Sequence, residues 1–136
     1  MRKLTEIIIH CSATEEGKDF KAANIKKWHT LPPPKGRGWK DIGYHFVIDL
    51  DGTIEKGRPI EQIGAHCLGH NSRSVGVCYV GGLRHGKPDD TRTEEQKKAL
   101  RKIVSELRRK YGVLEVHGHC EYANKKCPCF DVRKEF

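Results

Sequence analysis

The sequence has no long apolar stretch. A membrane-spanning helix needs about eighteen or more consecutive apolar residues, and no run in this chain approaches that length. No internal repeat recurs, and Gly 14 with Pro 6 is too little for a collagen-like or low-complexity protein. The basic start, residues 1–6, is followed by neither an apolar signal region nor a small-residue cleavage site. We therefore expect no signal peptide, synthesis in the cytoplasm, and no association with a membrane.

What the chain does contain is enough for one apolar core. It has 136 residues, 36% of them hydrophobic and 32% charged, with a mass of 15.5 kDa and a mean hydropathy of −0.70. This length is that of one domain. We expect a single domain spanning residues 1–136, and a monomer is the default expectation.

The charge balance is strongly basic. Lys and Arg number 26 and Asp and Glu 18, which gives a formal net charge of +8. Such a charge favours a polyanionic partner, such as nucleic acid, teichoic acid or an anionic cell surface. A solvated basic surface with no specific partner is an equally good interpretation. No helix-turn-helix, zinc-finger or aromatic RNA-binding motif is visible, so no specific nucleic acid is expected.

Cysteine and histidine are unusually frequent, with six and eight residues. In a secreted mini-protein six cysteines would suggest three disulfides. Without an export signal, reduced buried thiols or metal ligands are the better interpretation. The cysteines are Cys11, Cys67, Cys78, Cys120, Cys127 and Cys129.

Short β-branched runs predict strands, and 3.6-residue periodicity predicts two helices. The expected strands are residues 4–9, 44–48, 53–55, 74–80 and 113–116, with a hairpin turn at Asp51-Gly52. The expected helices are residues 19–31, capped by Asp19, and 93–111, with Thr93 and Gln96 as a capping box. Residues 83–92 and 117–129 are expected to be irregular, and residues 130–136 to form a last helical turn. This order predicts an α/β fold with a central mixed sheet flanked by helices.

Three side chains near predicted strand ends suggest a metal site. His10 ends the first strand, His119 follows the last strand, and Cys127 comes eight positions later. Two imidazoles and a thiolate suit zinc, with a fourth position left open, as in catalytic zinc sites. The alternatives are a buried core histidine for His10 and a small apolar core residue for Cys127. Other ligands are available nearby: His117, Cys120 and Cys129.

Six segments in order give a stronger signal than spacing, in a pattern that runs from about residue 7 to about residue 131. They are IIIHCSAT (7–14), DIGYHFVI (41–48), DGTI (51–54), IGAHCLGHN (63–71), SVGVCYVG (74–81), and GHCE (118–121) followed by KKCP (125–128). This pattern resembles the amidase-2 family of zinc-dependent N-acetylmuramoyl-L-alanine amidases, most of all the small phage lysozymes that are amidases. Peptidoglycan recognition proteins resemble it more distantly.

The resemblance implies a mixed sheet with a zinc groove on one side. It assigns the zinc ligands to His10, His119 and Cys127, and the activity-associated pair to Tyr44 and Lys125. Zinc polarises the amide carbonyl and activates water, Lys125 stabilises the oxyanion, and Tyr44 carries a proton or orients a group. Which of the two handles the proton stays open, and Lys126 is a rival to Lys125.

Other residues of the matched segments have weaker assignments. His66 and Asn71 are expected to line the groove and contact the stem peptide or sugar. His45 follows Tyr44 on a predicted strand, so it points to the opposite face and is structural or on the surface. Trp39, in the loop before Tyr44, is expected to border the groove, whereas Arg37 lies in the same loop at a position too irregular to assign.

The expected reaction is zinc-dependent hydrolysis of the bond between N-acetylmuramic acid and L-alanine in peptidoglycan, after release of the enzyme to the cell wall. Many non-catalytic recognition proteins lack the cysteine ligand, whereas this sequence has the complete set. Two alternatives remain: a peptidoglycan-binding module without catalysis, and a polymerase-inhibiting regulator. The short segment before His10 argues weakly against the regulator.

Overall fold

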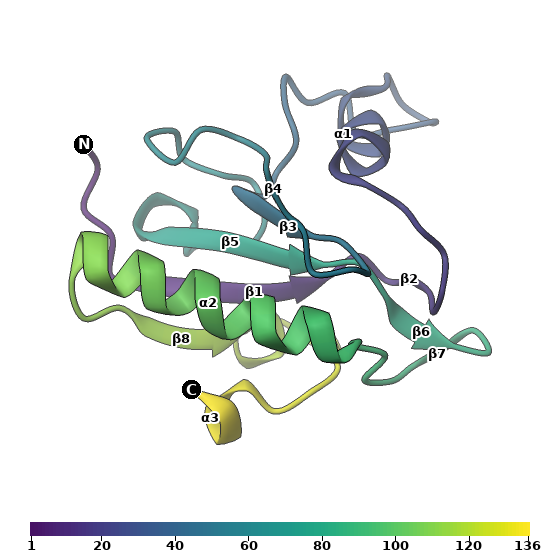
Figure 1. Ribbon diagram of the computed structural model, residues 1–136. Helices are drawn as coiled ribbons and strands as arrows, with labels where there is room; N and C mark the ends of the chain where they lie inside the picture. Colours follow the sequence, from purple (N-terminus) through teal and green to yellow (C-terminus); the bar gives the residue numbers. More distant parts are fainter.

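The computed structural model describes residues 1–136 and has a five-stranded mixed sheet at its centre (Figure 1). The strand order is β4-β3-β5-β1-β8. β1 pairs in parallel with β5 and β8, β3 pairs in parallel with β5, and β4 is antiparallel to β3. The strands are β1 (Glu6–Cys11), β3 (Phe46–Ile48), β4 (Ile54–Lys56), β5 (Ser74–Tyr79) and β8 (Glu115–Gly118). The predicted α/β fold with a mixed sheet is confirmed.

One predicted irregular segment is ordered into strands. Residues 83–92 contain most of β6 (Gly82–Arg84) and all of β7 (Lys87–Pro88), which form an antiparallel pair. β2 (Thr14–Glu15) adds to β6 in parallel and completes a small three-stranded sheet. These strands are only two or three residues long, and the residues of β7 are exposed. The prediction of an irregular segment was therefore wrong, because strands of two or three residues are too short to show an alternating apolar pattern.

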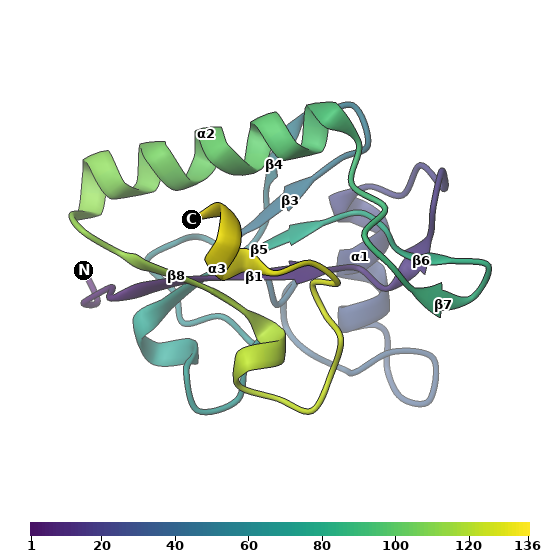
Figure 2. The ribbon, with the colours of Figure 1, turned by 90° about the horizontal axis from the view of Figure 1, so that it is seen from below.

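Helix α2 (Glu94–Tyr111) covers one face of the central sheet (Figure 2). Thr93 accepts a hydrogen bond from the Gln96 N–H, and the Gln96 side chain accepts one from the Thr93 N–H, so the predicted capping box is confirmed. The buried side of α2 packs on alternate residues of β1 and β5 in a 15-residue core. Its members on these elements are Ala99, Leu100, Ile103, Val104, Leu107, Ile7, Ile9, Cys11, Val75, Val77 and Tyr79.

Helix α1 (Ala22–Thr30) packs beside β3 on the opposite face. Ile25 is its buried residue and contacts a small cluster that includes Val47 and Cys78. The predicted start at Asp19 is wrong, since Lys21 occupies the N-cap position and Asp19 instead pairs with the Lys21 ammonium at 3.0 Å. None of the helices combines the length and the apolar composition that crossing a membrane demands.

Alternation of side chains along β1 determines which residues lie on the face of the central sheet opposite α2. Ile7, Ile9 and Cys11 point toward α2, so His10 points to the other face. The predicted strand ended at His10, and β1 continues one residue further, through Cys11, so that His10 lies inside the hydrogen-bonded ladder. His10 is therefore presented on a rigid strand.

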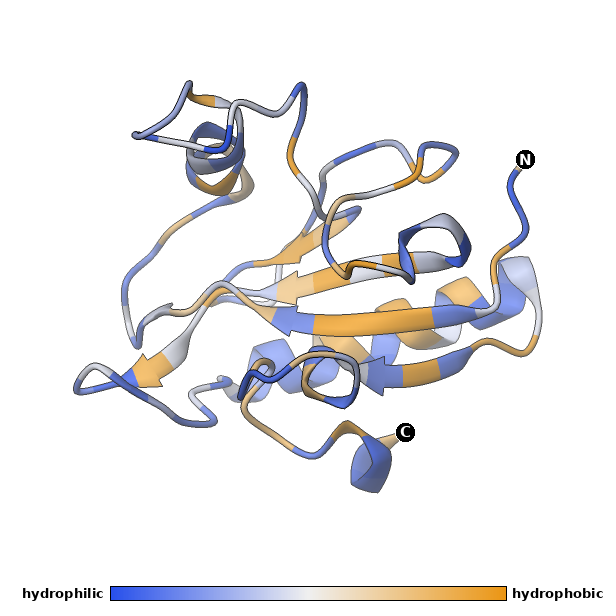
Figure 3. Cartoon of the chain, turned by 180° about the vertical axis from the view of Figure 1, so that it is seen from behind, coloured by the Kyte–Doolittle hydropathy of each residue, from blue (hydrophilic) through white to orange (hydrophobic).

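The apolar strands lie between hydrophilic loops (Figure 3). The short helix α3 (Val132–Glu135) lies beside β8 and is the predicted last helical turn.

Candidate active site

His10, His119 and Cys127 meet at one edge of the sheet. His10 comes from β1, His119 begins the 3-10 turn η2 (His119–Glu121) directly after β8, and Cys127 lies in the following loop. Because β1 and β8 are parallel neighbours, their carboxyl ends lie at the same edge. One ligand atom of each residue lies within 4.8 Å of the others. The group can hold a metal ion.

The surroundings of the three side chains suit a metal site. His10 Nδ1 lies 3.9 Å from Cys127 Sγ, and the two histidine rings are 4.5 Å apart between centroids. The Cys11 N–H donates a hydrogen bond to Cys127 Sγ at 3.2 Å. Burial lowers the pKa of His10 well below its usual value and also lowers that of His119, to which Lys125 contributes. Both imidazoles are therefore neutral near pH 7, the form that binds metals.

The alternative ligands lie elsewhere. His117 has each ring nitrogen 2.9 Å from a carboxylate oxygen, one of Glu121 and one of Glu115. Cys120 is exposed, and Cys129 contacts the Cys11 thiol at 3.9 Å. All six cysteines are free thiols, so no disulfide competes for Cys127.

A cavity of about 600 Å³ opens beside the group. Tyr44, His119 and Lys125 line it, and the Tyr44 ring lies 5.0 Å from the His10 ring. Burial, with a smaller effect of the Cys78 thiol, raises the pKa of Tyr44 well above its usual value, so its hydroxyl keeps its proton at neutral pH. The rim includes Trp39, which was expected to border the groove, and also Arg37, whose guanidinium lies 5.0 Å from the centre of the Trp39 ring.

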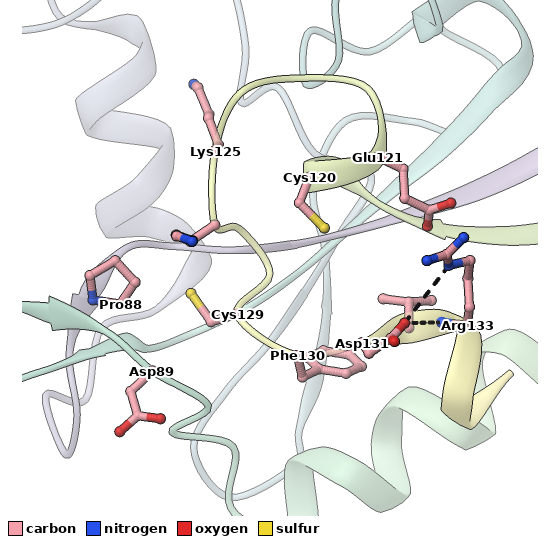
Figure 4. A pocket seen from close by; sticks show the side chains of 11 residues that line it. Pro88, Asp89, Cys120, Glu121, Lys125, Cys129, Phe130, Asp131 and Arg133 are labelled. Atoms are coloured by element: carbon pink, nitrogen blue, oxygen red, sulfur yellow. Dashed lines mark hydrogen bonds and ion pairs between the residues drawn. The ribbon is translucent and has the colours of Figure 1, made fainter.

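Lys125 and Lys126 line one cavity together, but only one of them also lines the cavity beside the metal-binding side chains. A second cavity of about 540 Å³ borders the loop of residues 119–129, and both lysines line it (Figure 4). Only Lys125 also lines the cavity beside His119. Lys125 is therefore the lysine that can reach a ligand near the three metal-binding side chains.

Comparison with known proteins agrees with this geometry. The family model of N-acetylmuramoyl-L-alanine amidase (Amidase_2) matches residues 1–130. The chain belongs to this amidase family.

Relatives and solved structures extend the likeness over nearly the whole chain. The amidase is 41% identical over 134 residues to an endolysin of Klebsiella phage KP32, covering 98% of this chain and 85% of that protein. N-acetylmuramoyl-L-alanine amidase LysC from Clostridium intestinale superposes with a TM-score of 0.82 at 27% identity, covering 98% of this chain and 83% of that one. The wild-type Drosophila protein PGRP-LB superposes with a TM-score of 0.79 at 26% identity, covering 99% of this chain and 80% of that one.

His66 and Asn71 line the same cavity of the amidase, but their polar atoms are used internally. His66 Nδ1 lies 2.9 Å from His10 Nε2. Asn71 Oδ1 accepts hydrogen bonds from the backbone N–H groups of His66 and Cys67, at 2.9 and 2.8 Å. Burial lowers the pKa of His66 to about 3, so it is neutral. Contact of either residue with substrate stays a prediction.

Two further histidines have positions that their spacing in the sequence did not predict. His45 lies just before β3 rather than in a strand with Tyr44, and it is 1% exposed. Its Nδ1 accepts a hydrogen bond from the Gly76 N–H at 3.0 Å, a structural role rather than a surface one. His29 lines the cavity and accepts a hydrogen bond from the Gly43 N–H at 2.9 Å, yet the sequence analysis missed it. Its place beside Trp28 near the end of helix α1 provides no such signal in the sequence.

Proposed function

We propose that this protein is a zinc-dependent amidase that hydrolyses the bond between N-acetylmuramic acid and L-alanine in peptidoglycan. The observation that carries the proposal is the grouping of His10, His119 and Cys127 beside a cavity lined by Tyr44 and Lys125, in a chain of the amidase family. A binding module alone would need neither a three-ligand metal group nor an adjacent ammonium.

The donor set fits zinc. Two neutral imidazole nitrogens and one sulfur are preferred zinc ligands, and three protein ligands are the number typical of catalytic sites. When bound, zinc supplies Lewis acidity that polarises the amide carbonyl and activates the attacking water. The cavity beside His119 leaves room for substrate to approach the ligands.

The other two residues provide charge and a proton. The Lys125 ammonium, on the cavity wall, stabilises the negative charge that develops on the carbonyl oxygen during attack. The Tyr44 hydroxyl keeps its proton at neutral pH because burial raises its pKa, so it acts as a hydrogen-bond donor that orients the substrate or passes a proton toward the leaving nitrogen. His10 packs against the Tyr44 ring, which fixes the position of that hydroxyl relative to the metal ligands.

We further propose that residues 1–136 form one catalytic domain that acts as a monomer on the cell wall after release from the cytoplasm. The net charge of +8 then serves attraction to the anionic wall rather than binding of a specific nucleic acid. Analytical ultracentrifugation tests the monomer, and a salt-dependent DNA mobility shift would contradict the absence of nucleic-acid binding.

The deciding experiment is mass spectrometry of the products from purified sacculi, with and without a zinc chelator. We expect free stem peptides that begin at L-alanine together with intact glycan strands, and loss of both products on chelation. Intact sacculi under both conditions, with bound protein, would replace the amidase by the binding module. Intact sacculi without binding would favour the regulator.

A further inference from the structure

We propose that His66 is a positioning residue that orients His10 for metal binding, and that it does not contact substrate. The inference rests on the proposed zinc site and assigns a role to a residue next to it. Its basis is the contact of 2.9 Å between His10 Nε2 and His66 Nδ1. Both rings are buried, with His10 1% and His66 9% exposed.

The nitrogen atoms define one consistent direction of hydrogen bonding. His10 turns Nδ1 toward Cys127 Sγ, at 3.9 Å, and Nε2 toward His66. A metal on Nδ1 requires the proton of neutral His10 to be on Nε2, from which it is donated to His66 Nδ1. The His66 proton is then on Nε2, which faces the hydroxyl of Ser74 at 3.3 Å. Both ring nitrogens of His66 are thus engaged within the protein.

The protein also holds the His66 ring in place. A Cβ atom on Gly76 would lie only 2.6 Å from the His66 ring, so the bare backbone of β5 is the surface on which the ring rests. A Cβ on Gly64 would lie 2.8 Å from the same ring. Asn71 fixes the His66 backbone through the hydrogen bond that it accepts from the N–H. The ring is therefore set before any metal binds.

Outer partners of this kind matter because they select the tautomer and ring orientation of a metal-binding histidine. Loss of such a partner typically lowers metal affinity about 10- to 100-fold. His119 has no comparable hydrogen bond from its ring, so His10 is the better anchored of the two histidines. The effect of a change at His66 should therefore appear in metal binding itself.

The test measures the zinc affinity of the full chain by competition with a chromophoric chelator, and the visible spectrum of the cobalt(II)-substituted protein. His66→Ala should lower zinc affinity about 10- to 100-fold and alter the cobalt spectrum. His66→Asn places an acceptor oxygen near the position of Nδ1 and should recover most of the affinity. Ser74→Ala keeps both rings and should produce a smaller loss, of about a few-fold.

Metal-free thermal unfolding of each variant controls for damage to the fold. If His66→Ala does not fold, the zinc affinity of Ser74→Ala tests the proposal instead. Unchanged zinc affinity and cobalt spectrum in both His66→Ala and His66→Asn, with only KM raised, would overturn the proposal and assign His66 to substrate. A wild-type protein that binds zinc but releases no stem peptide would contradict the proposed function and leave this inference standing.

Discussion

Replacing Gly76 by alanine should damage the metal site from a distance. Gly76 lies in β5, where the extended backbone accepts alanine, so no conformational strain accompanies the change. In an open position Gly→Ala would gain about 0.5–1 kcal/mol from reduced backbone entropy. Here, however, the new methyl group would lie 2.6 Å from the His66 Cγ and Cδ2 atoms and 2.9 Å from Nδ1. The sign of the effect therefore depends on whether the ring can move.

The size of the required movement follows from these distances. Ordinary contact begins at 3.4 Å, so the ring must shift by about 0.8 Å. If the shift is directed away from His10, the 2.9 Å contact between the two rings stretches to about 3.7 Å, beyond hydrogen-bond range. Overpacking of a core costs about 1–3 kcal/mol, which exceeds the entropic gain. We expect a net loss of about 1–2 kcal/mol in stability and about tenfold weaker zinc binding.

A double-mutant cycle in the metal-free protein measures the stability term by urea unfolding. Gly76→Ala should destabilise the wild type, but in the His66→Ala background the methyl group enters vacated space and should cost much less. The coupling free energy should be about 1–2 kcal/mol. Equal costs in the two backgrounds, or an unchanged zinc affinity in Gly76→Ala alone, would refute the reasoning.

Three further predictions address the ligand, the ammonium and one buried carboxylate. Cys127→Ala should abolish turnover and lower the zinc content measured by atomic emission; full zinc occupancy would show that another thiol is the ligand. Lys125→Ala should lower kcat about 10²- to 10³-fold with zinc retained, whereas the control Lys126→Ala should stay within about twofold; the reverse result would exchange their roles. Burial, with a contribution from neighbouring Glu55, raises the pKa of Asp49 to about 7, above its unfolded value of about 4. Protonated Asp49 therefore stabilises the fold at low pH, and this stability is lost as the pH rises through about 7. Asp49→Asn should be more stable than the wild type at about pH 8, by on the order of 1 kcal/mol, with the difference vanishing near about pH 4; denaturant midpoints that differ equally at both pH values would contradict this.

Helix α2 shows how much local sequence could predict. Thr93, Gln96 and the apolar stripe at helical spacing define its start and buried face, and the structure has both. Helix α1 begins at Ala22 rather than at Asp19, because Asp19 pairs with the Lys21 side chain instead of capping the helix. Such a choice depends on where side chains lie in space, which periodicity does not record.

The predicted metal group likewise separates what the sequence predicts from what depends on positions in space. Two imidazoles and a thiol at separated positions suggest zinc chemistry, and the order of the motifs identifies the family. Neither signal excludes His117 or Cys129 as ligands. The tertiary structure does so. Pairing of β1 with β8 brings His10 and His119 to one edge, whereas both ring nitrogens of His117 lie 2.9 Å from carboxylates of Glu115 and Glu121, and the Cys129 thiol lies 3.9 Å from the Cys11 thiol.

Residue types and their spacing were enough to set the chemistry available to this protein: the donor types, the capped helix, the β-branched strands and the motif order that identifies the amidase family. These features are local, so a linear reading recovers them. Which groups meet depends instead on tertiary packing. His66 was predicted from its motif as a groove residue; it lines the cavity, and only the tertiary structure shows that its two ring nitrogens face His10 and Ser74, at 2.9 and 3.3 Å. The role of a histidine depends on the partner of each ring nitrogen, and those partners lie far apart along the chain.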